Sequence, residues 1–510
     1  MKYFKTTLLT LTLISAILPI MFIFPGCARE QNRERPTQLR YGFTSEPRTL
    51  DPLSPGNTAD GRSILFNVFE GLVKPNPDGT FMPAIAESWT IDPAFLIYTF
   101  TLREGVRFHD GSIVTAEDVK FSLDTAIANE FIGLNRINEV LIYGENQIKI
   151  ILNSPDPYFL PFLTVGIIQA GNTNRERVVI GTGPFFIESY TTQRELVLRR
   201  FDYYWQRFLD PPREIPSLEK VTIVFFANFE AMMTSLRGGN IDGANLTGAY
   251  VAQLNQRDFY AFHNNSSAVQ VLALNNARAP FDDVRVRRAI SYGIDVQEII
   301  NAAFFGSGSH SGSPVIPGLT EYFESNLGYV HNPQRALEYL AQAGFYGGNQ
   351  ISFEIAAPSN YGMHVDTAQV ITNQLNRIGI QATIRLVDWS TWLSDIHRDR
   401  NYQATVISID SRVVSARSFL SRYHSENSSN FINFASEDFD RVYASMLTET
   451  DSSVRNQLYR EAQKIIAGEA ASVFIQDIVH YVVLRRGAFG GVLNYPLYVV
   501  DFASIYGIGN

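Results

Sequence analysis

The histidines and serines that could support catalysis lack the spacing of a catalytic or metal site. The eight histidines stand at positions 109, 263, 310, 331, 364, 397, 424 and 480. No two have the i, i+4 spacing that places a pair of zinc ligands on one helix face. The loop 306–312 sets serines beside His310, but it does not match the G-x-S-x-G nucleophile turn. The sequence therefore predicts neither an enzyme nor a resident metal or cofactor.

Glycines at 181 and 183 give a second segment the look of a phosphate-binding loop. A P-loop also needs a Lys-Ser/Thr pair, which residues 181–185 lack, and Pro184 removes an amide donor. We therefore interpret this segment as a tight turn before a strand.

Asp410 is the residue whose position best suits the binding of a charged ligand. It follows an apolar run over 404–409 that predicts a strand. A carboxylate at the end of such a strand can face a cleft. A surface acid at a strand end is the alternative interpretation.

Cys27, the only cysteine, follows a segment typical of export. Lys2 and Lys5 precede an uncharged apolar stretch over 6–24, and Gly26 stands directly before Cys27. This order indicates a secretory signal, and the cysteine after it resembles the lipidated first residue of a bacterial lipoprotein. An uncleaved membrane helix and an ordinary signal with an incidental cysteine are the alternatives.

The charge of the chain is acidic. The formal net charge is −9, and removal of residues 1–26 with their two lysines leaves −11. Nucleic-acid binding depends on Lys and Arg that neutralise phosphates, so this class of partner is excluded. Docking on anionic lipid by charge is disfavoured for the same reason.

Strand and helix patterns alternate along most of the chain. Alternation predicts strands over 39–43, 97–102, 196–200, 221–226, 380–386, 402–409 and 473–484, and a hairpin over 140–152. Caps and closing glycines predict helices after Thr115 and Asp283, between Asn332 and Gly344, and over 365–377 and 451–467. This alternation favours an α/β fold with mixed sheets.

A set of motifs runs in order through the chain. They occupy residues 45–52, 69–73, 83–89, 98–111, 115–119, 181–185, 202–205, 239–242 and 280–290. The most specific reads Tyr-Thr-Phe-Thr-Leu-Arg-Glu-Gly-Val-Arg-Phe-His-Asp-Gly over 98–111. In order and spacing the motifs resemble the peptide-binding members of the family 5 solute-binding proteins of bacterial ABC importers.

The resemblance implies a two-lobed periplasmic-binding-protein fold (type II, cluster C) with an extra inserted domain and mixed sheets. We expect a lipoprotein signal peptide over 1–26 and a tether over 27–37. Lobe I would comprise 38–63, 181–268 and 480–510, the inserted domain 64–180, and lobe II 269–479. The lobes would close over the ligand by a hinge motion.

The resemblance also implies a set of ligand-binding residues. In peptide-binding relatives an aspartate at the place of Asp410 pairs with the ligand's α-amino group, and a tryptophan at the place of Trp389 lines a side-chain pocket. Leu393 falls at another pocket position, while Ile407 and Ser408 fall where the backbone of the peptide is bound. Core packing is the alternative role of Trp389.

The resulting hypothesis is a monomeric lipoprotein that binds extended peptides and delivers them to ABC permease subunits. It would be anchored through Cys27 to a bacterial membrane, in the periplasm or at the cell surface. Two alternatives stay open: the same fold binding an oligosaccharide or a nickel complex, and a surface adhesin.

Overall fold

The computed structural model describes residues 35–54, 57–208, 216–264, 268–310, 312–346, 351–411 and 413–509. The expected signal peptide, Cys27 and the tether up to residue 34 lie outside the described residues. Within them, we find no helix whose length and apolar character would let it cross a membrane.

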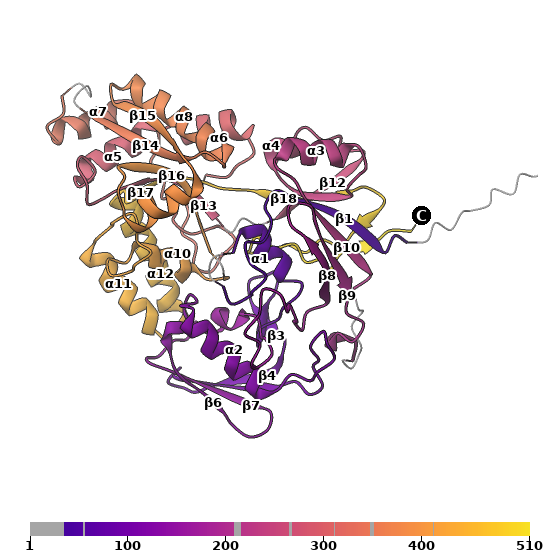
Figure 1. The fold of residues 1–510 in the computed structure, drawn as a ribbon. Helices are drawn as coiled ribbons and strands as arrows, with labels where there is room; N and C mark the ends of the chain where they lie inside the picture. Colours follow the sequence, from indigo (N-terminus) through magenta and orange to yellow (C-terminus); the bar gives the residue numbers. More distant parts are fainter. Residues whose placement is uncertain are drawn as a thin grey trace, which may run out of the picture.

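A seven-stranded sheet forms the first lobe, called lobe I below (Figure 1). β1 lies at its centre and pairs in parallel with β10 and β11, while the outer strands are antiparallel. Helices α3 (Phe229–Arg237) and α4 (Gly248–Val251) cover one part of the sheet. In spatial order the strands are β12 (Phe259–Asn264), β18 (His480–Arg485), β11 (Gly243–Thr247), β1 (Gln38–Phe43), β10 (Lys220–Phe225), β9 (Glu195–Arg200) and β8 (Phe185–Thr191).

A five-stranded mixed sheet forms lobe II. Its order is β15 (Gln381–Val387), β14 (Ser352–Pro358), β16 (Ala404–Asp410), β13 (Ala268–Leu274) and β17 (Ser472–Asp477). One face packs on α5 (Val284–Gly293), α6 (Val296–Phe304), α7 (Pro333–Gln342) and α8 (Gly362–Arg377). The other packs on α10 (Ala416–Leu420), α11 (Glu437–Thr448) and α12 (Ser452–Gly468). The sheet is therefore buried on both sides.

A third, four-stranded sheet lies beside lobe I (Figure 1, lower part). Its strands are β4 (Ala86–Ile91), β5 (Ile97–Leu102), β7 (Gln147–Leu152) and β6 (Ile137–Ile142), packed on α2 (Ala116–Ala128). We call this unit the inserted domain. A single hydrophobic cluster runs from its core into that of lobe I. The residue limits predicted for the three units stay a prediction.

Local signals in the sequence account for several of these elements. Thr115 and Asp118 form the reciprocal capping box of α2, and Asp283 accepts a 2.8 Å bond from the amide of Arg285, the second residue of α5. Gly144, with φ of 74°, turns the hairpin between β6 and β7. The turn over 181–184 leads into β8, as predicted. The His109 ring is hydrogen-bonded to this turn through both nitrogens: Nδ1 accepts from the amide of Gly181, and Nε2 bonds to the carbonyl of Gly183.

One predicted strand is wrong. Residues 473–484 form two strands, β17 and β18, which belong to different sheets. Ile478 and Val479 lie buried between them and carry the chain from lobe II to lobe I. Residues 473–484 contain no glycine or proline that would indicate a break, so the sequence pattern predicts a single strand.

Three buried histidines predict the response of stability to acid. Burial lowers the pKa of His109 and of His480 to about 4, and of His364 to about 3. Below pH 6.5 these histidines bind protons in the unfolded chain but not in the folded chain. The free energy of unfolding therefore decreases as the pH is lowered. Asp60 opposes this trend, because burial raises its pKa to about 6 and the folded state then binds the extra proton. Together these four groups should reduce the free energy of unfolding by about 4 kcal/mol from pH 7 to pH 5, measured by urea unfolding.

The variant His109→Asn should reduce this loss by about 2 kcal/mol, since one proton is removed from the balance. His263 is exposed on β12, and His263→Asn is the matched control that should leave the loss unchanged. Equal stability at pH 5 and pH 7 would show that the buried histidines do not govern the acid response.

Candidate functional site

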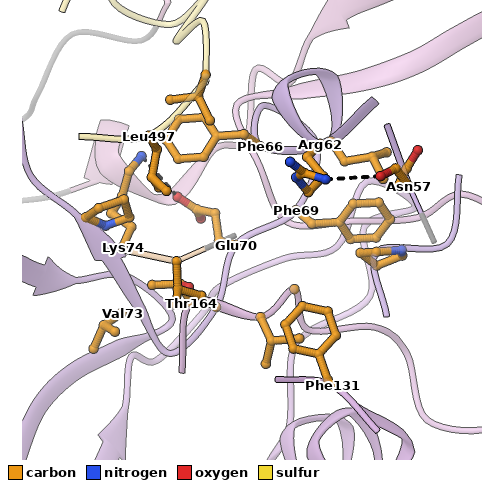
Figure 2. Close-up of a pocket in the computed structure, with 18 of the residues that line it drawn as sticks. Asn57, Arg62, Phe66, Phe69, Glu70, Val73, Lys74, Phe131, Thr164 and Leu497 are labelled. Atoms are coloured by element: carbon orange, nitrogen blue, oxygen red, sulfur yellow. Dashed lines mark hydrogen bonds and ion pairs between the residues drawn. The ribbon is translucent and has the colours of Figure 1, made fainter. Parts of the chain in front are cut away.

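A cavity of about 150 Å³ lies where the two lobes meet. Most of its wall comes from α1 (Ala59–Leu65) and the segment that follows, together with residues 164–166 and 497–499. Lobe II contributes Ser411 and Val413, directly after β16. Figure 2 shows Arg62 on one side of this cavity and Lys74 on the other.

Asp410 joins the two lobes at the edge of this cavity. Its Oδ2 accepts a 2.6 Å bond from Nη2 of Arg62, which stands on α1 of lobe I. Arg422 lies 3.8 Å from the other carboxylate oxygen and donates to the backbone carbonyl of Asp410. Arg62 is held in turn by the carbonyl of Asn57 (Figure 2). The predicted ligand-binding carboxylate is therefore compensated by two guanidinium groups.

The strand that presents Asp410 has one open edge. β13 pairs with β16 along all seven residues, from Ala404 to Asp410. In the described part of the chain, β14 pairs with β16 only at Ala404 and Thr405. β14 ends at Pro358, which lacks an amide hydrogen to continue the ladder. Residues 406–410 thus have no strand paired with them on that side among the described residues.

The other four predicted site residues lie on lobe II around this strand. Trp389 stacks on Trp392 at 5.0 Å between ring centroids and packs, together with Leu393, on the lobe II core. Ile407 is 5% exposed within that core. The Oγ of Ser408 is buried and has no hydrogen-bond partner among the described residues.

Asp410 reaches the cavity through its bond to the lining residue Arg62 and is not itself among the described residues that line it. Among the described residues that line it, none of Trp389, Leu393, Ile407 and Ser408 is found. Sequence reasoning missed Arg62, Lys74 and most of the lobe I wall. The motif over 69–73 was a signal for part of that wall, whereas nothing local marked Arg62.

Glu70 connects the motif over 69–73 to the motif over 202–205. Its carboxylate accepts a 2.6 Å bond from the Tyr204 hydroxyl and a 2.7 Å bond from the Trp205 indole. Arg103 lies over the Trp205 ring at 4.2 Å. These contacts tie the motifs over 69–73, 98–111 and 202–205 into one buried support behind the cavity.

A buried carboxyl group, that of Asp60, stands in the first turn of α1. Asp60 accepts bonds from the Tyr498 hydroxyl at 2.7 Å and from the Ser45 amide at 2.9 Å. Burial raises the pKa of Asp60 to about 6, although these bonds oppose the rise. The network fixes the start of α1, and with it the position of Arg62.

Contacts between the inserted domain and lobe II close the far end of the interface. Arg417 of α10 pairs with Asp156, whose side chain is 1% exposed, and Arg136 pairs with the same carboxylate at 2.9 Å. Nearby, Arg455 donates to the Tyr158 hydroxyl at 2.7 Å. No group of His, Cys, Asp and Glu within the described residues is arranged to hold a metal ion.

The comparisons with known proteins agree with this architecture. Residues 80–431 match the model of the bacterial extracellular solute-binding proteins, family 5 middle. Heme-binding protein A of Haemophilus influenzae is 26% identical, over 95% of this chain and 96% of its own. The dipeptide-binding protein of Escherichia coli is 23% identical, over 92% and 94%.

Solved structures show the same fold. The oligopeptide-binding protein AppA of Bacillus subtilis, in complex with a nonapeptide, superposes with a TM-score of 0.81 at 20% identity, over 93% of this chain and 99% of its own. NikA of Brucella suis, in complex with Fe(III)-EDTA, gives 0.82 at 21% identity, over 92% and 99%. The predicted two-lobed α/β fold of the periplasmic binding proteins is confirmed.

A glycine contact between the lobes offers a test of closure. A Cβ added at Gly248 of α4 would lie 2.1 Å from the Cβ of Ser307, which follows α6. The variant Gly248→Ala should therefore push the lobes apart at this contact. Overpacking of this kind costs about 1–3 kcal/mol, and it would destabilise the arrangement in which the two lobes touch here. We therefore expect a larger radius of gyration by small-angle X-ray scattering.

The matched control is Gly468→Ala, since a Cβ at Gly468 meets no atom within 4 Å. Its scattering should equal that of the wild type. An unchanged curve for Gly248→Ala would mean that this contact does not limit how far the lobes close.

Proposed function

The chain belongs to family 5 of the bacterial extracellular solute-binding proteins, and on this premise we propose that it captures extended peptides between its two lobes and passes them to the membrane permease of an ABC importer. A solute-binding role in such an importer follows from the family itself. The choice of peptides is the proposal, and it rests on the strand edge that ends at Asp410.

The open edge of β16 supports the peptide assignment. An extended peptide can add to an exposed strand through its backbone, with little dependence on its side chains. Residues 406–410 present such an edge, and the opposite wall of the cleft is α1. The unpartnered hydroxyl of Ser408 is a further polar group beside this edge.

Asp410 would then bind the ammonium group of the peptide. In the structure its carboxylate is occupied by Arg62 at 2.6 Å, so the ligand must replace the guanidinium group as the partner. Such an exchange leaves the number of ionic contacts at Asp410 the same while it releases Arg62. It also explains how a carboxylate is kept between the lobes without an unpaired charge.

Ligand binding would favour the closed arrangement of the lobes. A ligand that contacts both walls binds the closed form more tightly and shifts the equilibrium toward it. The permease would then distinguish the closed form from the open one.

A non-peptide solute is the second candidate within the family. Similar proteins carry names for heme and deoxycholate, and one similar structure holds a nickel–histidine complex. The apolar wall around Phe66 and Phe69 favours this candidate, because it suits an apolar body as well as a side chain.

We further propose that Cys27 carries a lipid anchor and that the protein acts as a monomer in the periplasm or at the cell surface. The anchor is supported by the sequence before Cys27, which lies outside the described residues. A tether would hold the receptor close to its permease.

The variant Asp410→Asn tests the peptide assignment. It removes the charge that would pair with the ligand ammonium while it keeps the shape of the side chain. We expect dipeptides and longer peptides with a free amine to bind about 30-fold more weakly, which corresponds to ~2 kcal/mol, measured by calorimetry. N-acetylated peptides should bind weakly and equally to both proteins.

The control is Asp438→Asn, which removes an exposed acid paired with Arg441 on α11. Equal affinity of Asp410→Asn and wild type for free-amine peptides would sink the role given to Asp410. Release of amino acids from the peptides would contradict the assignment as a binding protein.

A further inference from the structure

Lys74 is a cation of the cavity wall that lacks a hydrogen-bond acceptor. It stands in β2 (Val73–Pro75), and its side chain is 15% exposed. Within the described residues, no hydrogen bond from its ammonium group is formed, and its nearest acid is Glu70, with 3.7 Å between Nζ and Oε1. An ammonium group has three donors, and here its charge is compensated by Glu70 and by the Phe66 ring, whose centroid lies 5.8 Å from Nζ.

Glu70 does not supply the missing acceptor. Both of its oxygens already accept short hydrogen bonds, one from Tyr204 and one from Trp205. These bonds hold the carboxylate in place behind the cavity wall. Lys74 therefore has partial charge compensation from Glu70 without a direct bond to it.

The space between Lys74 and Arg62 is apolar. Phe66, Phe69, Val413 and Leu497 contribute to the wall there, and Figure 2 shows Phe66 between the two cations. At the other side of the cavity Arg62 is already paired with Asp410. The wall thus offers a polar end at Arg62, which is paired with Asp410, an apolar middle, and the Lys74 cation at the other end.

We propose that Lys74 binds a carboxylate of the ligand, so that the cavity selects compact ligands with an apolar body and an acidic end. This inference rests on the proposed function in placing the ligand ammonium at Asp410. For a peptide, the carboxylate is either the C-terminus of a short chain or an acidic side chain. In both cases the carboxylate accepts a charge-assisted hydrogen bond from the Lys74 ammonium group.

Paired peptides that differ only in one carboxylate test this role. Leucyl-leucine and its C-terminal amide report on the terminus, and leucyl-glutamate amide and leucyl-glutamine amide report on a side chain. In the wild type we expect the acid of at least one pair to bind about 10- to 100-fold more tightly than its neutral partner, measured by calorimetry. The pair that shows the difference identifies the source of the carboxylate.

The variant Lys74→Met keeps the length of the side chain and removes its charge, so the preference for the acid should disappear. Lys74→Arg should retain most of the preference. Lys464→Met, at a surface lysine that is 58% exposed on α12, should leave it unchanged. Persistence of the preference in Lys74→Met, or its absence in the wild type, would overturn the role of Lys74.

Binding of no peptide at all would refute the proposed function without deciding this inference. The comparison is then made with 4-phenylbutyrate and its amide, an apolar acid and its neutral form. Tighter binding of the acid by the wild type and not by Lys74→Met supports the inference, and absence of that difference refutes it.

Discussion

The arrangement of the lobes depends on a two-residue connection, Ile478 and Val479, between β17 of one sheet and β18 of the other. The three Cα–Cα steps from Asp477 to His480 span at most about 11 Å, so the lobes cannot separate at this point and we expect them to move by rotation about it. In the structure the end of β16 lies against α1, where Asp410 meets Arg62 at 2.6 Å. The cavity lies beside this contact, between α1 with the segment after it and Ser411 and Val413, which follow β16.

Charges between the lobes are compensated to different degrees, and the less compensated ones are the proposed ligand contacts. Asp156 is 1% exposed and bound by Arg136 and Arg417, a state that is costly to break by removing one partner. The Arg62–Asp410 pair is more exposed, and under the proposed function it is the pair that a ligand replaces. Lys74 stands at the other extreme, with a carboxylate nearby but no bond to it. The interface is thus fixed at one end and open to a ligand at the other.

Elements with a local signal were predictable from the sequence, and contacts between distant segments were not. Alternating residues over 97–102 predict β5, and the Thr115 cap predicts the start of α2, because both depend on neighbours in the chain. The crossing at Ile478 has no such signal, since a buried strand and a buried connection share the same composition. Asp410 was a candidate because it ends a strand and stands at the place of the family's aspartate, and its role stays a prediction, whereas Arg62 is 348 residues away and its contact with Asp410 exists only in the folded protein.

The hydrophobic cluster that runs without a break from the inserted domain into lobe I has a dynamic consequence. Because densely packed cores do not deform continuously, these two units are expected to move as one body. The molecule then has two moving parts rather than three, and the opening has a single degree of freedom. Its kinetics should follow one relaxation time, even though the cleft is bordered by three sheets.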